Sequence, residues 1–166
     1  MKEINNIRSI GILSDSHIPT RAKEIPKSVF EMFKNTDLII HCGDIITQDI
    51  IIELNEIAPT YSVKGNMDPD DITFPTELIL KINERFVFCI SHGNGDPFSL
   101  KHRLYKKFQI YKPDIIIFGH SHISENSKYN NVIMFNPGSC TQGLNGNSVG
   151  IINIKDDGFV GEIRKI

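Results

Sequence analysis

Short apolar segments that end in Asp, Asn or His recur along the chain and restrict the folds that it can adopt. These segments are Ser9–Leu13, Asp37–Cys42, Thr60–Gly65, Arg85–Ser91 and Asp114–Gly119. Their length and their content of Ile and other β-formers are typical of buried strands. Segments with a helical spacing of apolar residues lie between the first three and before the last. The pattern therefore predicts βαβ units and parallel strands.

Three helices and several further strands complete the predicted elements. The helices are expected at residues 25–35 with Pro26 in the first turn, at residues 47–57 with Thr47 as N-cap, and at residues 97–111 with Leu100, Leu104 and Phe108 on one face. The additional strands are expected at residues 77–82, 131–136, 148–154 and 159–166, the first joined to Arg85–Ser91 by a hairpin at Asn83-Glu84. We expect two packed sheets with helices outside, in one domain that spans residues 1–166.

The composition indicates which kinds of binding partner are unsuited to this chain. The formal net charge of -2 gives no support for a nucleic-acid or anionic-membrane partner, because both favour a basic surface. No apolar run approaches the roughly 20 residues of a membrane span, and the first residues lack a signal-peptide pattern. The three cysteines, Cys42, Cys89 and Cys140, include no CxxC pair and cannot form a disulfide framework. We therefore expect a reduced, cytoplasmic protein, and leave open whether it forms a homo-oligomer.

Polar side chains follow each of the five apolar strands, at the point where the strand ends. They are Asp15 and His17, Asp44, Asn66, His92, and the pair His120 and His122. Ligands of open α/β sheets bind at the carboxyl ends of the strands, so these side chains should meet at one rim. Residues two apart on an extended chain point the same way, so each i, i+2 pair could offer two ligands. Any one of these residues alone is more often a turn former or a loop residue, but the joint pattern favours a metal site.

The donor set indicates which metals would bind. Four imidazoles, two carboxylates and one amide exceed the ligands of one metal, whereas two metals that share a carboxylate use them all. Nitrogen and oxygen ligands without thiolate favour Mn, with Ni, Zn or Fe as alternatives, over Ca or Mg. Two divalent cations would outweigh two carboxylates, so the site would attract phosphate. Paired metals are suited to the in-line displacement of a phosphate ester.

Six short motifs of the chain resemble those of a known enzyme family. The motifs "DSH", "GD", "GNMD", "SHG", "GHSH" and "NPGS" occur in the order and spacing of the calcineurin-like metallophosphoesterases, and the match extends from about Ile10 to Ser139. The short chain and the "NPGS" motif resemble the small bacterial and archaeal phosphodiesterase branch. The family implies a four-layer αββα sandwich of two mixed β-sheets flanked by helices.

The resemblance also implies roles for the seven side chains. Asp15, His17 and His122 would hold one metal, Asn66, His92 and His120 the other, and Asp44 would bridge the two. A hydroxide that bridges the metals would attack phosphorus, which makes Asp44, Asn66 and His92 the residues expected to matter most for catalysis. The implied reaction is hydrolysis of a small-molecule phosphodiester.

Three departures from the family pattern concern the groups around the substrate. Many members have a His directly after the Asn of "GN", proposed to protonate the leaving group, where this chain has Met67. Relatives also often carry a His where this chain has Asn94. The segment "CTQGLNG" replaces the Pro-Arg pair that often follows "NPGS". The general acid is therefore unidentified, and one cation that could contact phosphate is missing.

The motifs leave other functions open. The alternatives are a phosphomonoesterase, and a metal-binding protein-interaction scaffold similar to the retromer subunit of the same fold. A nuclease is disfavoured because no basic face with interleaved aromatic residues is evident.

Four further features have no assigned role in the chemistry. Asp68 is interpreted as a turn or supporting residue, Arg21 as a solvated loop residue rather than a phosphate contact, and the basic run Lys101–Lys107 as a solvated helix face. His41 fits a core histidine and a supporting residue equally well.

Overall fold

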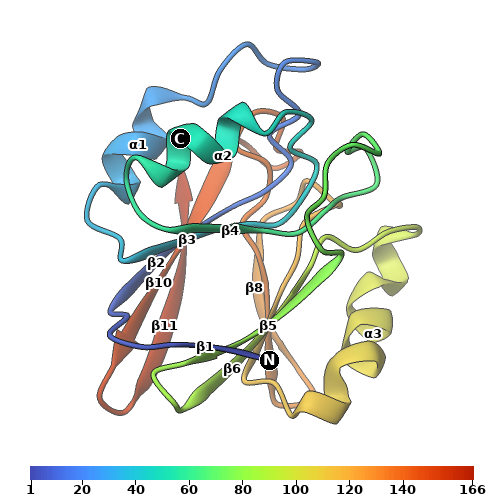
Figure 1. The fold of residues 1–166 in the computed structure, drawn as a ribbon. Coiled ribbons are helices and arrows are strands. Elements are labelled where there is room, and N and C mark those ends of the chain that lie inside the picture. The colour runs from blue at the N-terminus through green and yellow to red at the C-terminus, as the bar shows by residue number, and fades with distance from the viewer.

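The computed structural model describes residues 1–166 and contains two β-sheets packed face to face (Figure 1). The six-stranded sheet has the order β1 (Lys2–Ile4), β5 (Glu77–Ile82), β6 (Phe86–Ser91), β7 (Ile115–Ile117), β9 (Val132–Asn136) and β8 (Glu125–Tyr129). The five-stranded sheet has the order β11 (Gly158–Lys165), β10 (Ser148–Lys155), β2 (Ser9–Leu13), β3 (Leu38–His41) and β4 (Thr60–Ser62). Each sheet contains both parallel and antiparallel pairs, so the two mixed sheets are confirmed.

Helices cover the outer face of each sheet. Helices α1 (Lys27–Phe33) and α2 (Asp49–Asn55) pack against the five-stranded sheet, where they share an apolar cluster with Leu13 and Ile39. Helix α3 (Pro97–Phe108), followed by the 3-10 turn η1 (Gln109–Tyr111), packs against the six-stranded sheet beside Cys89 and Ile116. The four-layer αββα sandwich is therefore confirmed.

Strands buried on both faces divide their side chains between two apolar clusters. In β2, Ile10 and Ile12 enter the core between the sheets, whereas Leu13 faces the helices. In β7, Ile115 and Ile117 lie between the sheets and Ile116 lies under α3. Successive side chains of a strand point to opposite faces, which is why an uninterrupted apolar run serves two layers.

Most predicted strands are confirmed, and the hairpin has a clear local cause. Asn83 and Glu84 both have positive φ angles, 52° and 59°, as a two-residue turn between twisted antiparallel strands requires. Two strands, β1 and β8, were not predicted. They form the two edges of the six-stranded sheet, and their sequences, KEI and ENSKY, carry the polar residues typical of edges rather than an apolar run.

The predicted helix starts were less accurate. Thr47 is not the N-cap of α2, because that helix begins at Asp49 with Gln48 at the cap; the Thr47 hydroxyl accepts only a long bond of 3.4 Å from the Asp49 N–H. Pro26 occupies the N-cap of α1 rather than its first turn. Helix α3 agrees with the prediction, and the Asp96 carboxylate caps it.

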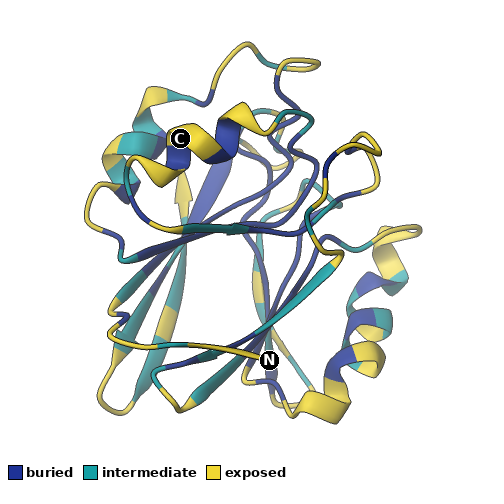
Figure 2. Ribbon diagram, viewed as in Figure 1, coloured by how far each residue is buried: buried dark blue, intermediate teal, exposed yellow.

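The direction of the strands places their carboxyl ends together. Strands β2, β3 and β4 run parallel within one sheet, and β6 and β7 run parallel within the other. Burial continues from these strands into the loops that follow them, at the upper end of the view in Figure 2. The loops that carry the predicted ligands are therefore packed parts of the fold.

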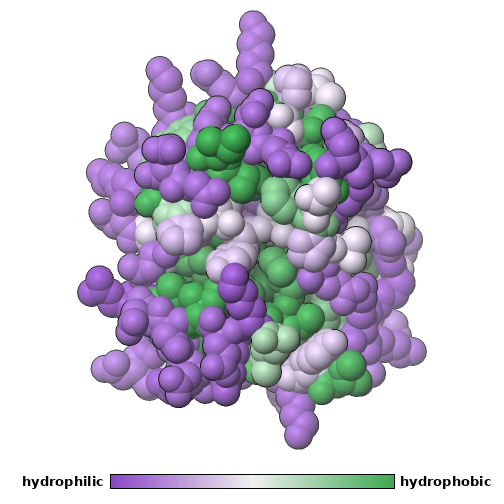
Figure 3. Space-filling model, viewed as in Figure 1, coloured by the Kyte–Doolittle hydropathy of each residue, from purple (hydrophilic) through white to green (hydrophobic).

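The surface is polar over most of the face drawn in Figure 3, and its apolar areas are separate from one another. One of them lies between the two sheets. Partly buried side chains such as Phe86 and Phe159 pack against the core there from the outside of the cluster. None of the helices combines the length and the apolar composition that a membrane crossing requires.

We predict that Gly150→Ala destabilises the fold by about 1–3 kcal/mol, because a Cβ at Gly150 would lie 2.4 Å from the Phe135 ring, which belongs to the opposite sheet. Urea unfolding would measure the loss. Gly158→Ala is the matched control, because no atom lies within 4 Å of its added Cβ. Equal unfolding free energies for the two variants would contradict the proposed packing of Phe135 against the five-stranded sheet.

Candidate metal centre

The backbone is unusual at five of the seven predicted ligands. Asp15, His17, Asp44, His120 and His122 have φ angles of 53°, 46°, 56°, 69° and 56°, in the left-handed region. Such angles are uncommon outside glycine and cost on the order of 1–3 kcal/mol each. They persist only where the surrounding structure imposes them, and they are concentrated at functional sites. The expectation that each i, i+2 pair lies on extended chain is therefore wrong. The pairs converge through left-handed turns instead.

Asp15, His17 and His122 form the first group of side chains that could hold a metal ion. The His122 Nε2 atom lies 3.2 Å from Asp15 Oδ1 and 3.2 Å from His17 Nε2. Asp15 and His17 are almost completely buried, and His122 is partly exposed. These three residues are the ones that the family resemblance assigns to one metal.

Asp15, Asp44 and His92 form the second group. The His92 Nε2 atom lies 3.2 Å from Asp44 Oδ2 and 3.9 Å from Asp15 Oδ1. Asp44 Oδ2 is also 3.6 Å from His17 Nε2, so this carboxylate stands between one histidine of each expected metal. Asp15 Oδ1 stands in a similar relation, 3.9 Å from His17 Nε2 and 3.9 Å from His92 Nε2, and Asp15 belongs to both groups.

Asn66 and His120 extend the second group toward solvent. The Asn66 Oδ1 atom lies 3.0 Å from His120 Nδ1, and the His120 ring meets the His92 ring edge-on at 5.4 Å between centroids. All seven predicted side chains therefore belong to one continuous cluster at the carboxyl ends of the strands.

Backbone carbonyls fix the orientation of three histidines. His92 Nδ1, His120 Nε2 and His122 Nδ1 donate to the carbonyl oxygens of Cys42, Gly95 and Gln142 at 2.7, 2.7 and 3.1 Å. A carbonyl oxygen only accepts, so the proton must sit on those nitrogens. The other nitrogen of each neutral ring then presents a lone pair to the cluster, as in metal-bound histidines.

Unpartnered buried atoms provide a direct test of whether the site fits a metal. The buried side-chain polar atoms without a hydrogen-bond partner are Asp15 Oδ1, His17 Nδ1 and His92 Nε2, and all three belong to predicted ligands. Asp15 Oδ1 and His92 Nε2 lie 3.9 Å apart, and an ion bound between them would recover the free energy that such buried, unpartnered atoms cost. His17 approaches the two carboxylates through Nε2 rather than through its unpartnered Nδ1. The residues present therefore fit a divalent cation.

The charges of the cluster also favour a bound cation. Burial by itself would raise the pKa of Asp15, but the interaction with His122 and the charges of His92 and His122 outweigh it and lower that pKa. Burial would lower the pKa of His92, yet the neighbouring carboxylates of Asp44 and Asp15 raise it overall. The carboxylates thus stay ionised and attract positive charge, which a metal supplies when it displaces the protons.

Asp68 organises the loops of two predicted ligands. Its Oδ2 atom accepts the N–H groups of Asp44 and Gly65 at 3.0 and 2.7 Å, and its Oδ1 atom accepts those of Ile45 and Ile46 at 2.6 and 2.8 Å. A single buried carboxylate therefore ties the loop after β3 to the loop after β4. The interpretation of Asp68 as a supporting residue agrees with these contacts.

His41 is a buried histidine with both ring nitrogens bonded. Its Nδ1 accepts the Gly43 N–H at 3.2 Å, so Nε2 carries the proton that it shares with Ser16 Oγ at 3.0 Å. Burial lowers the pKa of His41 to about 4, which keeps the ring neutral near pH 7. His41 is therefore a core histidine whose two partners, Gly43 and Ser16, directly adjoin the predicted ligands Asp44, Asp15 and His17, so the contacts agree with both interpretations.

This chain has Met67 and Asn94 at two positions where many family members have histidine. Both residues lie at the edge of the cluster. The Met67 side chain is half exposed, and only its backbone N–H reaches the site, donating to Asp44 Oδ1 at 2.7 Å. The Asn94 Oδ1 atom accepts from Arg103 at 3.1 Å. Arg21 is exposed, as expected.

Sequence reasoning missed two kinds of contact. The carbonyls that orient His92, His120 and His122 leave no trace in residue type, because every residue has one. The second is made by Ser139 of "NPGS", whose hydroxyl donates to the Asp15 carbonyl at 2.7 Å and accepts the Gln142 N–H at 2.8 Å. The motif itself was the signal that could have revealed this role.

A family profile matches this arrangement. Residues 9–157 match the profile described as the calcineurin-like phosphoesterase superfamily domain. The chain belongs to that superfamily. The resemblance inferred from the motifs is therefore confirmed.

Individual relatives place the chain more closely. It is 39% identical to a probable metallophosphoesterase of Methanocaldococcus jannaschii over 80% of this chain and 68% of that protein. It is 29% identical to a phosphodiesterase of the same organism over 87% and 92% of the two chains. The fold matches Vps29 of Entamoeba histolytica, solved in complex with zinc, with a TM-score of 0.75 at 21% identity over 94% and 98% of the chains.

We predict that Asp68→Asn weakens both the fold and metal binding. The new amide group faces backbone N–H donors that an ionised carboxylate satisfied, which should cost about 2–3 kcal/mol of unfolding free energy and about 10–100-fold in metal affinity. Urea unfolding and metal titration by calorimetry measure the two effects. Asp70→Asn is the matched control, because the Asp70 side chain is fully exposed and contacts only Lys64. Wild-type values for Asp68→Asn in both measurements would refute the supporting role.

Proposed function

We propose that this chain is a phosphodiesterase that uses two divalent metal ions. The observation that carries the proposal is the pair of buried, unpartnered atoms Asp15 Oδ1 and His92 Nε2, which lie 3.9 Å apart within the two groups of side chains that could hold a metal ion. The similarity to an archaeal phosphodiesterase over most of both chains supports the choice of reaction. A small-molecule diester is the expected substrate.

We assign Asp15, His17 and His122 to one metal and Asn66, His92 and His120 to the other. Asp44 would bridge them, which its distances of 3.6 Å to His17 Nε2 and 3.2 Å to His92 Nε2 support. The mixture of imidazole, carboxylate and amide donors favours a transition metal, with Mn preferred and Ni, Zn or Fe as alternatives. Once bound, the two metals would supply an acidified water and would neutralise charge that develops on the phosphate oxygens.

The protein's own residues determine how precisely that chemistry is positioned. The carbonyls of Cys42, Gly95 and Gln142 hold three imidazole rings, and the Met67 N–H holds Asp44 Oδ1. These contacts fix the ligands before the substrate arrives, so little reorganisation is needed during the reaction. Five of the seven predicted ligands have left-handed backbone angles, and the strain in their backbone accompanies this rigidity.

The choice of a diester over a monoester rests on charge. A monoester dianion carries one more negative charge than a diester and needs more cationic contacts. The positions where relatives carry histidines hold Met67 and Asn94, and the segment after "NPGS" has no arginine. The metal centre itself thus offers few additional cations, which favours the less charged ester.

A metal-binding interaction scaffold is the second candidate. It is supported by the match in fold to Vps29 and by exposed apolar side chains near the centre, of which Phe98 is 99% and Leu144 is 75% exposed. The complete ligand set favours the enzyme.

The test of the proposed function begins with removal of metal by a chelator. Mn, Ni, Zn, Fe or Mg is then added singly, and hydrolysis of bis(p-nitrophenyl) phosphate and p-nitrophenyl phosphate is followed in parallel. We expect diester hydrolysis that returns with transition metals, and a loss of at least about 100-fold in Asp44→Ala and in His92→Ala, because each removes a predicted ligand. Metal binding without turnover of either ester would favour the scaffold instead.

A second prediction concerns the missing acid. Because position 67 holds no histidine, we expect little protonation of the leaving group, so rates should fall as the pKa of the leaving alcohol rises. Met67→His should therefore speed hydrolysis of methyl p-nitrobenzyl phosphate, whose alcohol leaves poorly, by about 10–100-fold. It should change the rate for the p-nitrophenyl diester much less. Met67→Gln is the control, since it is polar but cannot donate a proton in this way, and equal effects of His and Gln would refute the explanation.

A further inference from the structure

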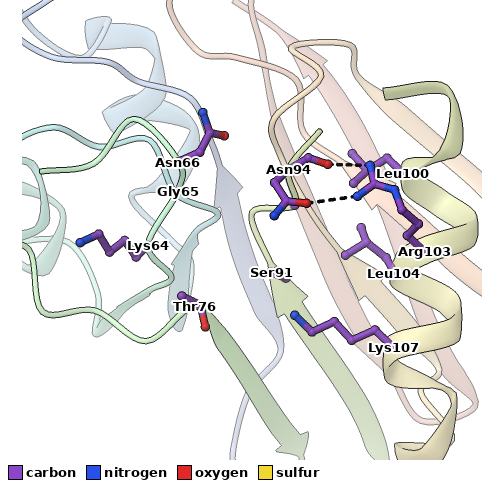
Figure 4. Close-up of a pocket in the computed structure, with 11 residues that line it drawn as sticks. Lys64, Gly65, Asn66, Thr76, Ser91, Asn94, Leu100, Arg103, Leu104 and Lys107 are labelled. Carbon is purple, nitrogen blue, oxygen red and sulfur yellow. Dashed lines mark hydrogen bonds between the residues drawn. The ribbon is translucent and has the colours of Figure 1, made fainter. Parts of the chain in front are cut away.

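A pocket of about 230 Å³ lies beside the metal centre, between the loop that follows β4 and helix α3 (Figure 4). Of its 11 lining residues only Leu100 and Leu104 are apolar; three are basic and none is acidic. The basic residues are Lys64, Arg103 and Lys107. Two of them belong to the basic run of α3, which is therefore more than a solvated helix face.

The pocket is continuous with the predicted centre. Asn66 lines the pocket and also meets His120 through its Oδ1 atom at 3.0 Å. Asn94, on the opposite wall, precedes Gly95, whose carbonyl accepts from the same histidine at 2.7 Å. A molecule bound at the centre can thus extend past Asn66 and Asn94 into the pocket.

Arg103 carries a charge that no carboxylate in contact neutralises. Its guanidinium donates to Asn94 Oδ1 at 3.1 Å and to the carbonyl oxygens of Asn94 and Asp96 at 2.6 and 2.8 Å, and its Nε donates to Ser99 Oγ at 3.2 Å. All of these partners are neutral oxygens. These contacts hold the guanidinium in place, and the charge of the Asp96 carboxylate, which caps the same helix, acts on it without forming an ion pair in contact.

The two lysines differ in where their charges lie. In Figure 4 the Lys107 side chain extends toward the cavity, where its ammonium pairs with Glu77 at the start of β5. Lys64 extends away from the cavity, and its ammonium lies 3.7 Å from Asp70. The cationic groups available to a ligand are therefore Arg103 and Lys107, and Glu77 competes for the second.

We propose that this pocket is an anion subsite, which binds a phosphate group carried on one arm of the diester substrate. The inference rests on the proposed function, because it extends the substrate away from the metal centre. The physiological substrate is then a diester of an alcohol that bears a second phosphate. The pocket supplies the positive charge that the centre lacks at Asn94 and after "NPGS".

The first experiment compares two substrates with the metal-loaded protein. One is p-nitrophenyl 2-(phosphonooxy)ethyl phosphate, and the other carries a neutral 2-methoxyethyl arm. We expect kcat/KM to be about tenfold higher for the phosphate-bearing arm, the size of one charge-assisted contact. The preference should shrink as salt is added, because the contact is partly exposed to solvent. A ratio near one at low salt would overturn the subsite.

Three variants test which residues create the preference. Lys107→Gln should reduce the ratio of the two kcat/KM values toward one. Glu77→Gln should increase it, because Lys107 is then released from its partner, and a merely structural role of the ion pair would not produce this opposite change. Lys106→Gln, on the exposed side of the same helix, should leave the ratio unchanged. Parallel changes in Lys107→Gln and Glu77→Gln would contradict the proposal.

A binding measurement separates failure of the subsite from failure of the proposed function. The methylphosphonate monoesters of the same two alcohols cannot undergo the nitrophenol-releasing reaction, and calorimetry gives their affinity for the metal-loaded protein. If neither nitrophenyl ester is hydrolysed but the phosphate-bearing phosphonate binds about tenfold more tightly through Lys107, the subsite stands and the diesterase function fails. If the esters are hydrolysed and the two phosphonates bind equally, the subsite is wrong.

Discussion

Lone pairs that face one another in a buried cluster are the constraint on which the rest of the structure depends. The Asp15 and Asp44 carboxylates and the inward nitrogens of the histidines are acceptors, and the outward ring nitrogens of His92, His120 and His122 are already committed to carbonyl oxygens. Such an arrangement is unfavourable without a cation. The fold must therefore be stable enough to hold it, and the metals should in turn stabilise the fold.

The sandwich holds the cluster because each sheet contributes part of it. Asp15, His17, Asp44 and Asn66 follow strands of the five-stranded sheet, and His92, His120 and His122 follow strands of the six-stranded sheet. The distance between the two halves of the centre therefore depends on how the sheets pack. Large and small residues interlock there, as Phe135 does against the glycines of β10 and β11. Packing between the sheets is thus coupled to the geometry of the metal centre.

The sequence predicted the elements whose physical signal is local. Apolar runs such as Ser9–Leu13 revealed the buried strands, and the residues directly after them revealed the cluster. The edge strands β1 and β8 could not be predicted, because an edge strand needs no apolar run. The left-handed turns could not be predicted, because Asp and His carry no preference strong enough to reveal them. The pocket at Arg103 could not be predicted either, because it forms between α3 and a loop distant in the chain. Residue types identified the candidate ligands, whereas geometry was needed to show what orients them.

A crystal structure of the protein loaded with Mn, with anomalous scattering recorded at the manganese edge, would test the two-metal assignment most directly. We expect two metal peaks, one beside Asp15, His17 and His122 and one beside Asn66, His92 and His120, with Asp44 in contact with both. A single peak, or ions that do not contact Asp44, would contradict this assignment.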